Sequence, residues 1–434
     1  MGISTEICGV NVQEGTPEGG AGQNKPFVRE GGRISMRIAF HVPSAGFLES
    51  RPGGENHTSG DGVAIANLLE ALRKRGHTVR IVSRVDARDF WQGRVPARRL
   101  IAEAALVRGE MKRFSPDAWL VYFSRITCPD LFSWWQHPKR YMILKGGGEG
   151  TKWAIKTMPR TWRKLFTFAY RQSLQRADWI EAFSPKDAQD IRSQGVPEER
   201  ICLLPCPIKP WTIIPSREEA RRALGLPEEP SVILCVSRLA VRRSADDHRP
   251  SKTESVLDLI RAFAALPPKA LLVVVGDGPG RRQIQEEAAK LKVNGRVHLA
   301  GMVEHSDVSW YYAACDFFAF PEKAEGNRAG LALLEAQACG RPLVSMDTEL
   351  ARMTTEPGRA GLLARDLNEF QQHLLALSQD RMRCDEMGRA AAAFVARSFT
   401  IDVRARQIEE LLLGHKPVST MSIAQPSCRP GGVS

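Results

Sequence analysis

The stretch Glu325-Gly-Asn-Arg-Ala-Gly-Leu-Ala-Leu-Leu-Glu335-Ala-Gln-Ala-Cys-Gly340-Arg-Pro342-Leu-Val combines several features that suit one ligand. Its first two glycines allow close backbone approach, and the free N–H groups of a helix expected from about Gly330 to Cys339 form an anion site. Glu335 lies inside that helix as a fixed acceptor for paired hydroxyls. Phosphate-facing N–H groups beside such a carboxylate predict a nucleotide-linked ligand. The alternative is an ordinary strand–helix–strand unit that ends at Gly340.

Strand-like and helix-like segments alternate on both sides of this stretch, which predicts an α/β protein with parallel sheets and right-handed crossovers. Four prolines interrupt the alternation, at positions 205, 207, 210 and 215, and it then restarts. We therefore expect two doubly wound Rossmann-like domains that face a cleft, because ligands bind beyond the carboxyl ends of such strands.

The expected divisions follow from this alternation. They are a disordered leader (1–35), an N-terminal Rossmann-like domain (36–205), a linker (206–216), a C-terminal Rossmann-like domain (217–398), a closing helix (399–416) and a flexible tail (417–434). Met36 opens a clean strand, so residues 1–35 are alternatively a misassigned start.

Composition is that of a globular protein with a sizeable core, since 43% of the 434 residues are hydrophobic and 25% are charged. No apolar run approaches the roughly 18 residues of a membrane span, and no secretory signal pattern opens the chain. Nine scattered cysteines fit reduced thiols better than a disulfide framework or a metal site. We therefore expect a cytoplasmic protein.

The formal charge of +12 is concentrated in one segment. Between Lys139 and Arg176 stand ten Lys or Arg residues and a single acid, Glu149. Aromatic residues are interleaved there, which fits a peripheral contact with the inner face of a membrane. An ordinary core helix with a solvated basic side also fits and is the preferred interpretation, and no nucleic-acid-binding module accompanies the charge.

Several short motifs occur in the order that one family has them. They are Leu224-Gly-Leu-Pro, Val236-Ser-Arg238-Leu, Ser251-Lys252, Val273-Val-Val-Gly276-Asp-Gly-Pro, Val297-His-Leu-Ala-Gly301-Met-Val303, Tyr311-Tyr-Ala-Ala-Cys-Asp316 and Leu334-Glu335-Ala-Gln-Ala-Cys-Gly340-Arg-Pro342. In this order the chain resembles the retaining glycosyltransferases of family GT4 (glycosyl transferases group 1), over about residues 36–414. The resemblance implies the GT-B fold with a helical C-terminal segment, a nucleotide-sugar donor such as a UDP- or GDP-sugar, and no metal or other cofactor. It makes residues 36–205 the acceptor-side domain and residues 217–398 the nucleotide-sugar-binding domain, and it leaves the acceptor open as a glycan, a lipid or a small molecule.

The resemblance also implies which residues carry the chemistry. Arg238 matches the family's arginine, and Lys252 matches its lysine across an insertion at 241–250, with Arg243 as the competitor. Their positive charges would stabilise the departing diphosphate. The first carboxylate of the family's E-x7-E motif falls on Asn327, unless Glu325 replaces it, and Glu149 is a candidate polar contact to the transferred sugar.

Further residues are implied as contacts to the two substrates. Glu335 matches the ribose-binding carboxylate. The other donor-binding candidates are Arg328, Ala329, Gly330 and Leu331 at the helix N-terminus, together with Gly276, Met302 and Val303. The acceptor-side candidates are Gly60, Asp61, Gly147 and Gly148.

Two departures from the family pattern support a different hypothesis. Asn327 stands where relatives have a glutamate, and Gly148 stands in the region where many relatives have a histidine. A catalytically weak protein of the same fold, binding a nucleotide or glycan as a scaffold, is therefore the alternative. Arg238, Lys252 and Glu335 argue against it, because a scaffold does not need a diphosphate clamp.

Overall fold

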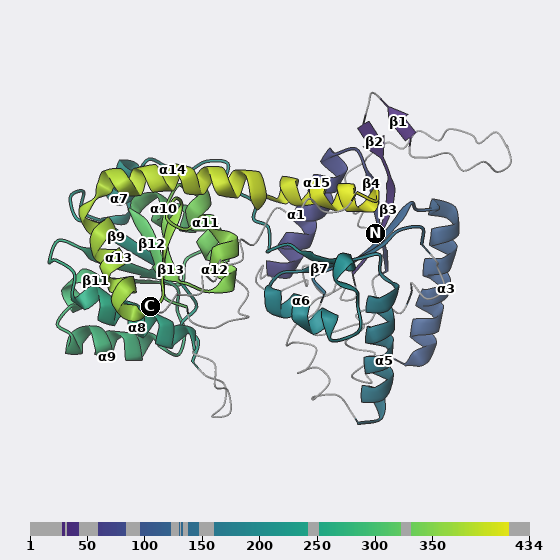
Figure 1. Cartoon of the computed structure of the whole chain (residues 1–434), viewed down its shortest axis with the longest axis horizontal. Coiled ribbons are helices and arrows are strands. Elements are labelled where there is room, and N and C mark those ends of the chain that lie inside the picture. The colour runs from purple at the N-terminus through teal and green to yellow at the C-terminus, as the bar shows by residue number, and fades with distance from the viewer. Residues whose placement is uncertain are drawn as a thin grey trace, which may run out of the picture.

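The computed structural model describes residues 28–30, 33–42, 60–83, 96–122, 130, 132, 138–146, 160–241, 251–322 and 331–415. Two six-stranded parallel sheets, each covered by helices, form two domains that lie side by side (Figure 1). The two doubly wound domains are those that the sequence pattern predicts, and together they form the GT-B arrangement that the family resemblance implies. The cleft expected between the domains stays a prediction.

The N-terminal sheet has the strand order β4-β3-β5-β6-β7-β8. Its strands are β3 (Arg37–His41), β4 (Thr78–Ser83), β5 (Ala118–Tyr122), β6 (Tyr141–Leu144), β7 (Trp179–Ala182) and β8 (Ile201–Leu203). Its helices are α1 (Gly60–Lys74), α3 (Ala97–Phe114), α5 (Arg160–Arg176) and α6 (Pro185–Arg192). All five residues of β5 are buried, as expected for a parallel strand covered on both faces.

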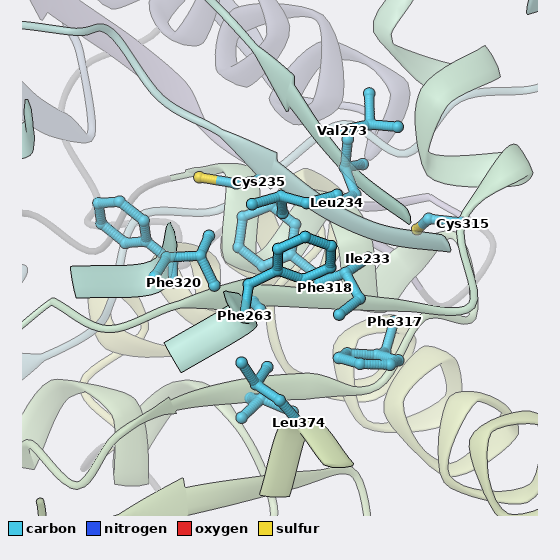
Figure 2. Close-up of a cluster of buried hydrophobic side chains, with 14 of the residues drawn as sticks. Ile233, Leu234, Cys235, Phe263, Val273, Cys315, Phe317, Phe318, Phe320 and Leu374 are labelled. Atoms are coloured by element: carbon cyan, nitrogen blue, oxygen red, sulfur yellow. The ribbon is translucent and has the colours of Figure 1, made fainter. Parts of the chain in front are cut away.

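The C-terminal sheet has the order β11-β10-β9-β12-β13-β14. Its strands are β9 (Val232–Val236), β10 (Leu271–Val275), β11 (Val297–Gly301), β12 (Phe317–Phe320), β13 (Leu343–Met346) and β14 (Gly361–Ala364). Its helices are α7 (Arg217–Leu224), α8 (Lys252–Ala264), α9 (Arg281–Lys290), α10 (Val308–Ala314), α11 (Leu331–Ala338), α12 (Glu349–Thr354), α13 (Leu367–Gln379) and α14 (Arg381–Ser398). Figure 2 shows how phenylalanines from β12 and α8 fill the core beside β9.

The last helix, α15 (Ile401–Leu412), returns to the N-terminal domain. In Figure 1 it continues the line of α14 and lies along α1. Its apolar residues Ala405, Ile408 and Leu412 are buried in the same core cluster as Ile38 and Phe40 of β3. The C-terminal segment therefore belongs to the packing of the first domain.

A buried ion pair connects α15 to β7 of the N-terminal sheet. The guanidinium of Arg404 hydrogen-bonds both the Glu181 carboxylate at β7 and the carbonyl oxygen of Pro205, and both side chains are under 5% exposed. Burial raises the pKa of Glu181, an effect that Arg404 opposes. Removing either partner would leave a buried charge without compensation.

The structure corrects and extends the sequence prediction in a few places. Residues 28–30 and 33–35 form an antiparallel pair of strands, β1 (Val28–Glu30) and β2 (Arg33–Ser35), so the expected leader at 1–35 is wrong for these residues. The sequence prediction also missed α7, α12 and β14. Each is short, from four to eight residues, so it carries little periodic signal.

Each sheet reverses its direction of winding once. In the C-terminal domain, β10 and β11 extend from β9 on one side, and β12 to β14 extend on the other. The reversal therefore lies between β9 and β12, and between β3 and β5 in the N-terminal domain. Ligands of doubly wound proteins bind beyond the carboxyl ends of the strands at this point.

Candidate active site

Arg238 lies just beyond the carboxyl end of β9, at the reversal of the C-terminal sheet. It is exposed, and no salt bridge to it occurs among the described residues. The loop that carries it is fastened to the next strand, because the N–H of Ser237 donates to the carbonyl of Val275 at 2.9 Å and that of Leu239 donates to Asp277 at 3.0 Å. The fixed backbone of this loop thus holds an exposed cation beyond the carboxyl end of β9.

Gly276 makes this fastening possible. Its φ is +125°, and a Cβ at this position would lie 2.1 Å from the carbonyl oxygen of Ser237. Only glycine lets the two loops approach so closely. This supports the loop of Arg238, and a contact between Gly276 and a donor stays a prediction.

Lys252 is the first residue of α8, directly after the N-cap Ser251. Ser251 and Glu254 form a capping box, which fixes where the helix begins. The Lys252 ammonium lies 5.1 Å from the centroid of the Phe320 ring and 3.5 Å from Glu322 Oε1, just beyond β12. Lys252 therefore lies on the β12 side of the reversal that Arg238 flanks, while its competitor Arg243 lies outside the described residues.

Glu335 is held on α11 with its side chain 12% exposed. The Tyr312 hydroxyl donates to its Oε2 at 3.0 Å, and His305 Nε2 lies 4.0 Å from Oε1. Burial raises the pKa of Glu335, whereas His305 and the Tyr312 hydrogen bond lower it. Two oxygens offer about four acceptor positions, so Tyr312 leaves capacity for a pair of hydroxyls.

The sequence prediction missed the aromatic residues around Glu335. The ring of Trp211, in the interdomain linker, lies 5.4 Å from that of His305 and 5.5 Å from that of Tyr312, centroid to centroid. Trp211 is half-buried, and Tyr312 is fully buried. Trp211 is far along the chain from His305, Tyr312 and Glu335, so no local pattern connects it to them. The family landmarks include Tyr312 but assign it no role.

Met302 and Val303 follow β11 at the same edge of the sheet. The Gly276 N–H donates to the carbonyl of Gly301 at 2.7 Å, which joins the ends of β10 and β11. Met302 is 70% exposed and Val303 packs against the core. The described donor candidates after β10 and β11 thus share one edge with Arg238.

The loop before α11 lies outside the described residues. This includes Glu325, Asn327, Arg328, Ala329 and Gly330. Leu331 is the first residue of α11 and is 40% exposed. Which residue fills the first position of the carboxylate motif stays open.

The N-terminal candidates are only partly described. Gly147, Gly148 and Glu149 lie outside the described residues, whereas Gly60 and Asp61 begin α1. Asp61 therefore lies in the first turn of the helix, and its contact with an acceptor stays a prediction.

Lys145 and Gly146, at the end of β6, are constrained by β7. Lys145 has a φ of +55°, and its N–H donates to Glu181 Oε2 at 2.9 Å. A Cβ on Gly146 would lie 2.5 Å from the Ile180 side chain. This turn is set by packing against β7, so its shape alone says little about a ligand.

Within the described parts of the chain, no cluster of three or more His, Cys, Asp or Glu side chains could hold a metal ion. None of the helices seen there is both long enough and apolar enough to cross a membrane.

Comparison with known proteins gives two family matches. Residues 58–211 match the family described as Glycosyltransferase Family 4, and residues 216–394 match Glycosyl transferases group 1.

Two curated relatives represent the sequence matches. A GDP-mannose-dependent alpha-(1-6)-phosphatidylinositol monomannoside mannosyltransferase of Mycobacterium tuberculosis is 25% identical over 336 residues, covering 74% of this chain and 79% of that protein. A GDP-mannose-dependent monoacylated alpha-(1-6)-phosphatidylinositol monomannoside mannosyltransferase of Corynebacterium glutamicum is 28% identical over 203 residues. That match covers 45% of this chain and 50% of the relative, so the chain spans only half the length of that protein.

Solved structures share the fold. Anabaena HepE in complex with UDP superposes with a TM-score of 0.60 at 18% identity, over 87% of this chain and 100% of that one. Sucrose-phosphate synthase from Thermosynechococcus elongatus gives 0.59 at 19% identity, over 87% and 99%. With the two family matches, the fold supports a GT4-type glycosyltransferase.

Proposed function

We propose that this GT4-type glycosyltransferase moves a sugar from a nucleoside diphosphate sugar to an acceptor, with retention of configuration and without a metal. One observation carries the proposal. Arg238 and Lys252 flank the reversal of the C-terminal sheet, and the Glu335 carboxylate lies on the helix that follows β12. Two cations and a ribose acceptor at one edge match the charge pattern of such a donor.

The two cations would act on the leaving group. When the bond from the sugar's anomeric carbon to the diphosphate oxygen breaks, that oxygen keeps the electron pair and gains negative charge. Arg238 and Lys252 would stabilise this charge in place of a metal ion. The acceptor oxygen bonds to the same face of the anomeric carbon, and its proton passes to the departing phosphate, so no separate carboxylate base is required.

The donor's remaining contacts come from the loop before α11. Backbone N–H groups of residues 328–331 would bind the diphosphate, with Arg328 adding charge. Asn327 or Glu325 would contact the sugar hydroxyls. Gly276, Met302 and Val303 would line the nucleoside side, and the base is UDP- or GDP-type by analogy with the relatives named above.

We propose a lipid-linked acceptor, because the mannosyltransferase relatives are named for phosphatidylinositol mannosides. A glycan or a small molecule is the alternative. Gly147, Gly148, Gly60 and Asp61 would face this acceptor, and Glu149 would contact the transferred sugar. We also propose a peripheral contact of the N-terminal domain with the cytoplasmic face of a membrane, through the basic segment Lys139–Arg176 and the neighbouring helix α3.

Two helices make the surface proposed for this contact. The outward side of α5 carries Lys164, Leu165, Phe168 and Arg171, with Leu165 and Phe168 about half exposed at 49% and 52%. On α3, which covers the same face of the sheet, Ile101 and Leu106 are each 68% exposed. Exposed apolar side chains among basic ones fit an anionic bilayer surface.

Vesicle co-sedimentation tests the membrane contact. We expect binding to vesicles of phosphatidylglycerol and phosphatidylcholine, with Ile101→Ser combined with Leu106→Ser lowering it by about tenfold. Met382→Ser, at an 85% exposed position of the other domain, is the matched control. Equal binding of both variants would remove this surface from the proposal.

Thermal unfolding with UDP, GDP and their common sugars tests the donor site. A nucleotide at about 100 times its dissociation constant should stabilise the protein by roughly 2.7 kcal/mol. Glu335→Ala should abolish most of that shift. If one nucleotide binds but no sugar is transferred to any acceptor tested, the scaffold alternative is favoured. If no nucleotide stabilises the protein, the proposed function fails.

A further inference from the structure

We infer that Trp211, a residue of the linker and of neither sheet, is a positioning residue for the nucleoside part of the donor. The inference rests on the proposed function, because it assigns a further element to the ribose site at Glu335. Its observation is independent of any sequence motif: two ring contacts and one hydrogen bond connect the linker to that carboxylate.

The first link is the ring of Trp211. Tyr312, fully buried, lies 5.5 Å from it at an interplanar angle of 51°, and His305 lies 5.4 Å away at 41°. Tilted aromatic pairs at such distances attract each other and restrict each other's motion. Trp211 therefore limits where the Tyr312 and His305 side chains can lie.

The second link is the Glu335 carboxylate. Tyr312 donates its hydroxyl hydrogen to Oε2 at 3.0 Å, and His305 Nε2 lies 4.0 Å from Oε1. The two residues that contact Trp211 thus approach opposite oxygens of the same acid. A carboxylate must be held in one rotamer to accept both ribose hydroxyls, because the diol has fixed geometry. Holding Tyr312 and His305 in place holds that rotamer.

The linker itself is fixed close by. Ile208 donates its N–H to the carbonyl of Phe399 at 2.8 Å and accepts from the N–H of Ile401 at 2.9 Å. Its side chain is buried with Leu334, the residue before Glu335. The linker therefore meets the neighbourhood of Glu335 at two points, through Ile208 and through Trp211.

This arrangement has a consequence for domain movement. Residues 205–216 and the junction of α14 with α15 are the chain crossings between the two sheets, and Ile208 pairs them. Hinges in two-domain proteins are a few such connecting residues. A change in the angle between the domains must act on the linker, so the ribose contact and the hinge share Trp211.

The test is nucleotide binding by isothermal titration with UDP and with GDP. Trp211→Ala should weaken binding of the preferred nucleotide by about fivefold, and Trp211→Phe should restore most of it, because phenylalanine keeps an aromatic ring. The donor KM should rise with little change in kcat, a split that general destabilisation would not produce.

Two control variants keep the result specific. Ile213→Ala changes an 82% exposed side chain of the same linker, and Trp310→Ala removes a 37% exposed tryptophan of α10, two residues from Tyr312. Both should bind nucleotide like the unmodified protein. Addition of nucleotide should also change tryptophan fluorescence, and Trp211→Phe should lose that change.

The outcomes separate the inference from the function on which it rests. If the unmodified protein binds a nucleotide and folded Trp211→Ala binds it equally well, the inference is wrong and the function stands. If the unmodified protein binds no nucleotide, both are wrong. If Trp211→Phe weakens nucleotide binding fivefold, as Trp211→Ala does, then the loss of affinity is not caused by loss of the aromatic contact.

Discussion

The two domains share a six-stranded parallel sheet, yet they use the charged residues at their strand ends differently. In the C-terminal domain Arg238 is exposed and the Lys252 side chain is 30% exposed, so both can meet a ligand. In the N-terminal domain Lys145, Glu181 and Arg404 are all buried. Charged side chains beyond the strands of the C-terminal sheet thus remain open to a ligand, whereas those near β6 and β7 of the N-terminal sheet are buried in the packing of the domain.

This difference in exposure depends on whether a later segment of the chain packs over the charged residues of each sheet. Arg404 comes from α15, whose packing on the N-terminal sheet brings the guanidinium to Glu181. Arg238 has no such helix among the described residues, and Gly276 holds only its backbone. Arg238 is thus a candidate for catalysis because no described segment covers it, whereas Glu181 is covered and paired by Arg404.

The largest expected effect is on the buried pair. Arg404→Ala should lower the free energy of unfolding by about 3–5 kcal/mol, because Glu181 would stay buried without its partner. Urea unfolding measures this. Arg406→Ala, on the same helix with a 53% exposed side chain, should change stability by under about 0.5 kcal/mol. If both variants lose a similar amount of unfolding free energy, the buried pair of Arg404 and Glu181 does not stabilise the protein more than an exposed charge does.

The second-largest effect is expected for substitution of the exposed Arg238. Arg238→Ala should reduce kcat by about 10²–10³ while leaving the unfolding temperature nearly unchanged, because the proposed role of its exposed side chain is to stabilise the departing diphosphate. Steady-state kinetics with the preferred donor would measure it. Arg282→Ala, at an 88% exposed side chain, is the control. If Arg238→Ala instead lowers the free energy of unfolding strongly, Arg238 has a structural role like that of Arg404.

A smaller effect is expected at Gly276, which lets the loop that carries Arg238 pack against the end of β10. Gly276→Ala should cost about 1–3 kcal/mol of stability, because alanine disfavours a φ of +125° and its Cβ would meet Ser237. Turnover should fall with it as the Arg238 loop shifts. Gly295→Ala meets nothing within 4 Å and should be nearly neutral. Unchanged turnover in a folded Gly276→Ala would show that the loop position is not critical.

The smallest effect expected is a pH dependence at Glu335. Burial raises its pKa above the ordinary value of 4.5, so acidification through that raised pKa adds a proton and removes an acceptor for ribose. Nucleotide affinity should fall as pH falls. Stability should move the opposite way, because a raised folded pKa favours the protonated folded state and the gain is lost as pH rises.

Titration with nucleotide at several pH values would measure the effect. Glu335→Gln is the control, since it cannot titrate while the nucleotide's own phosphates still do. An identical pH profile in both proteins would contradict the assignment of this dependence to Glu335.

The sequence predicted most of the fold because its strands and helices have strong periodic signals. Glu335, Arg238 and Lys252 could be named as candidates because each lies in a short motif that the family resemblance supplied, and their roles stay predictions. Trp211 and His305 could not be found as partners of Glu335, since only tertiary packing joins the linker, the β11–α10 loop and α11. The strands at 28–35 were missed because each has three residues, too few for a period to show.

Isothermal titration of UDP and GDP into the unmodified protein and Glu335→Gln tests the central claim most directly, that the edge of the C-terminal sheet is a nucleotide-sugar site. We predict that one nucleotide binds, with the variant weaker by about tenfold or more, because the amide that replaces the carboxylate is a weaker acceptor for the ribose hydroxyls. Equal binding by both proteins, or binding by neither, would contradict the claim.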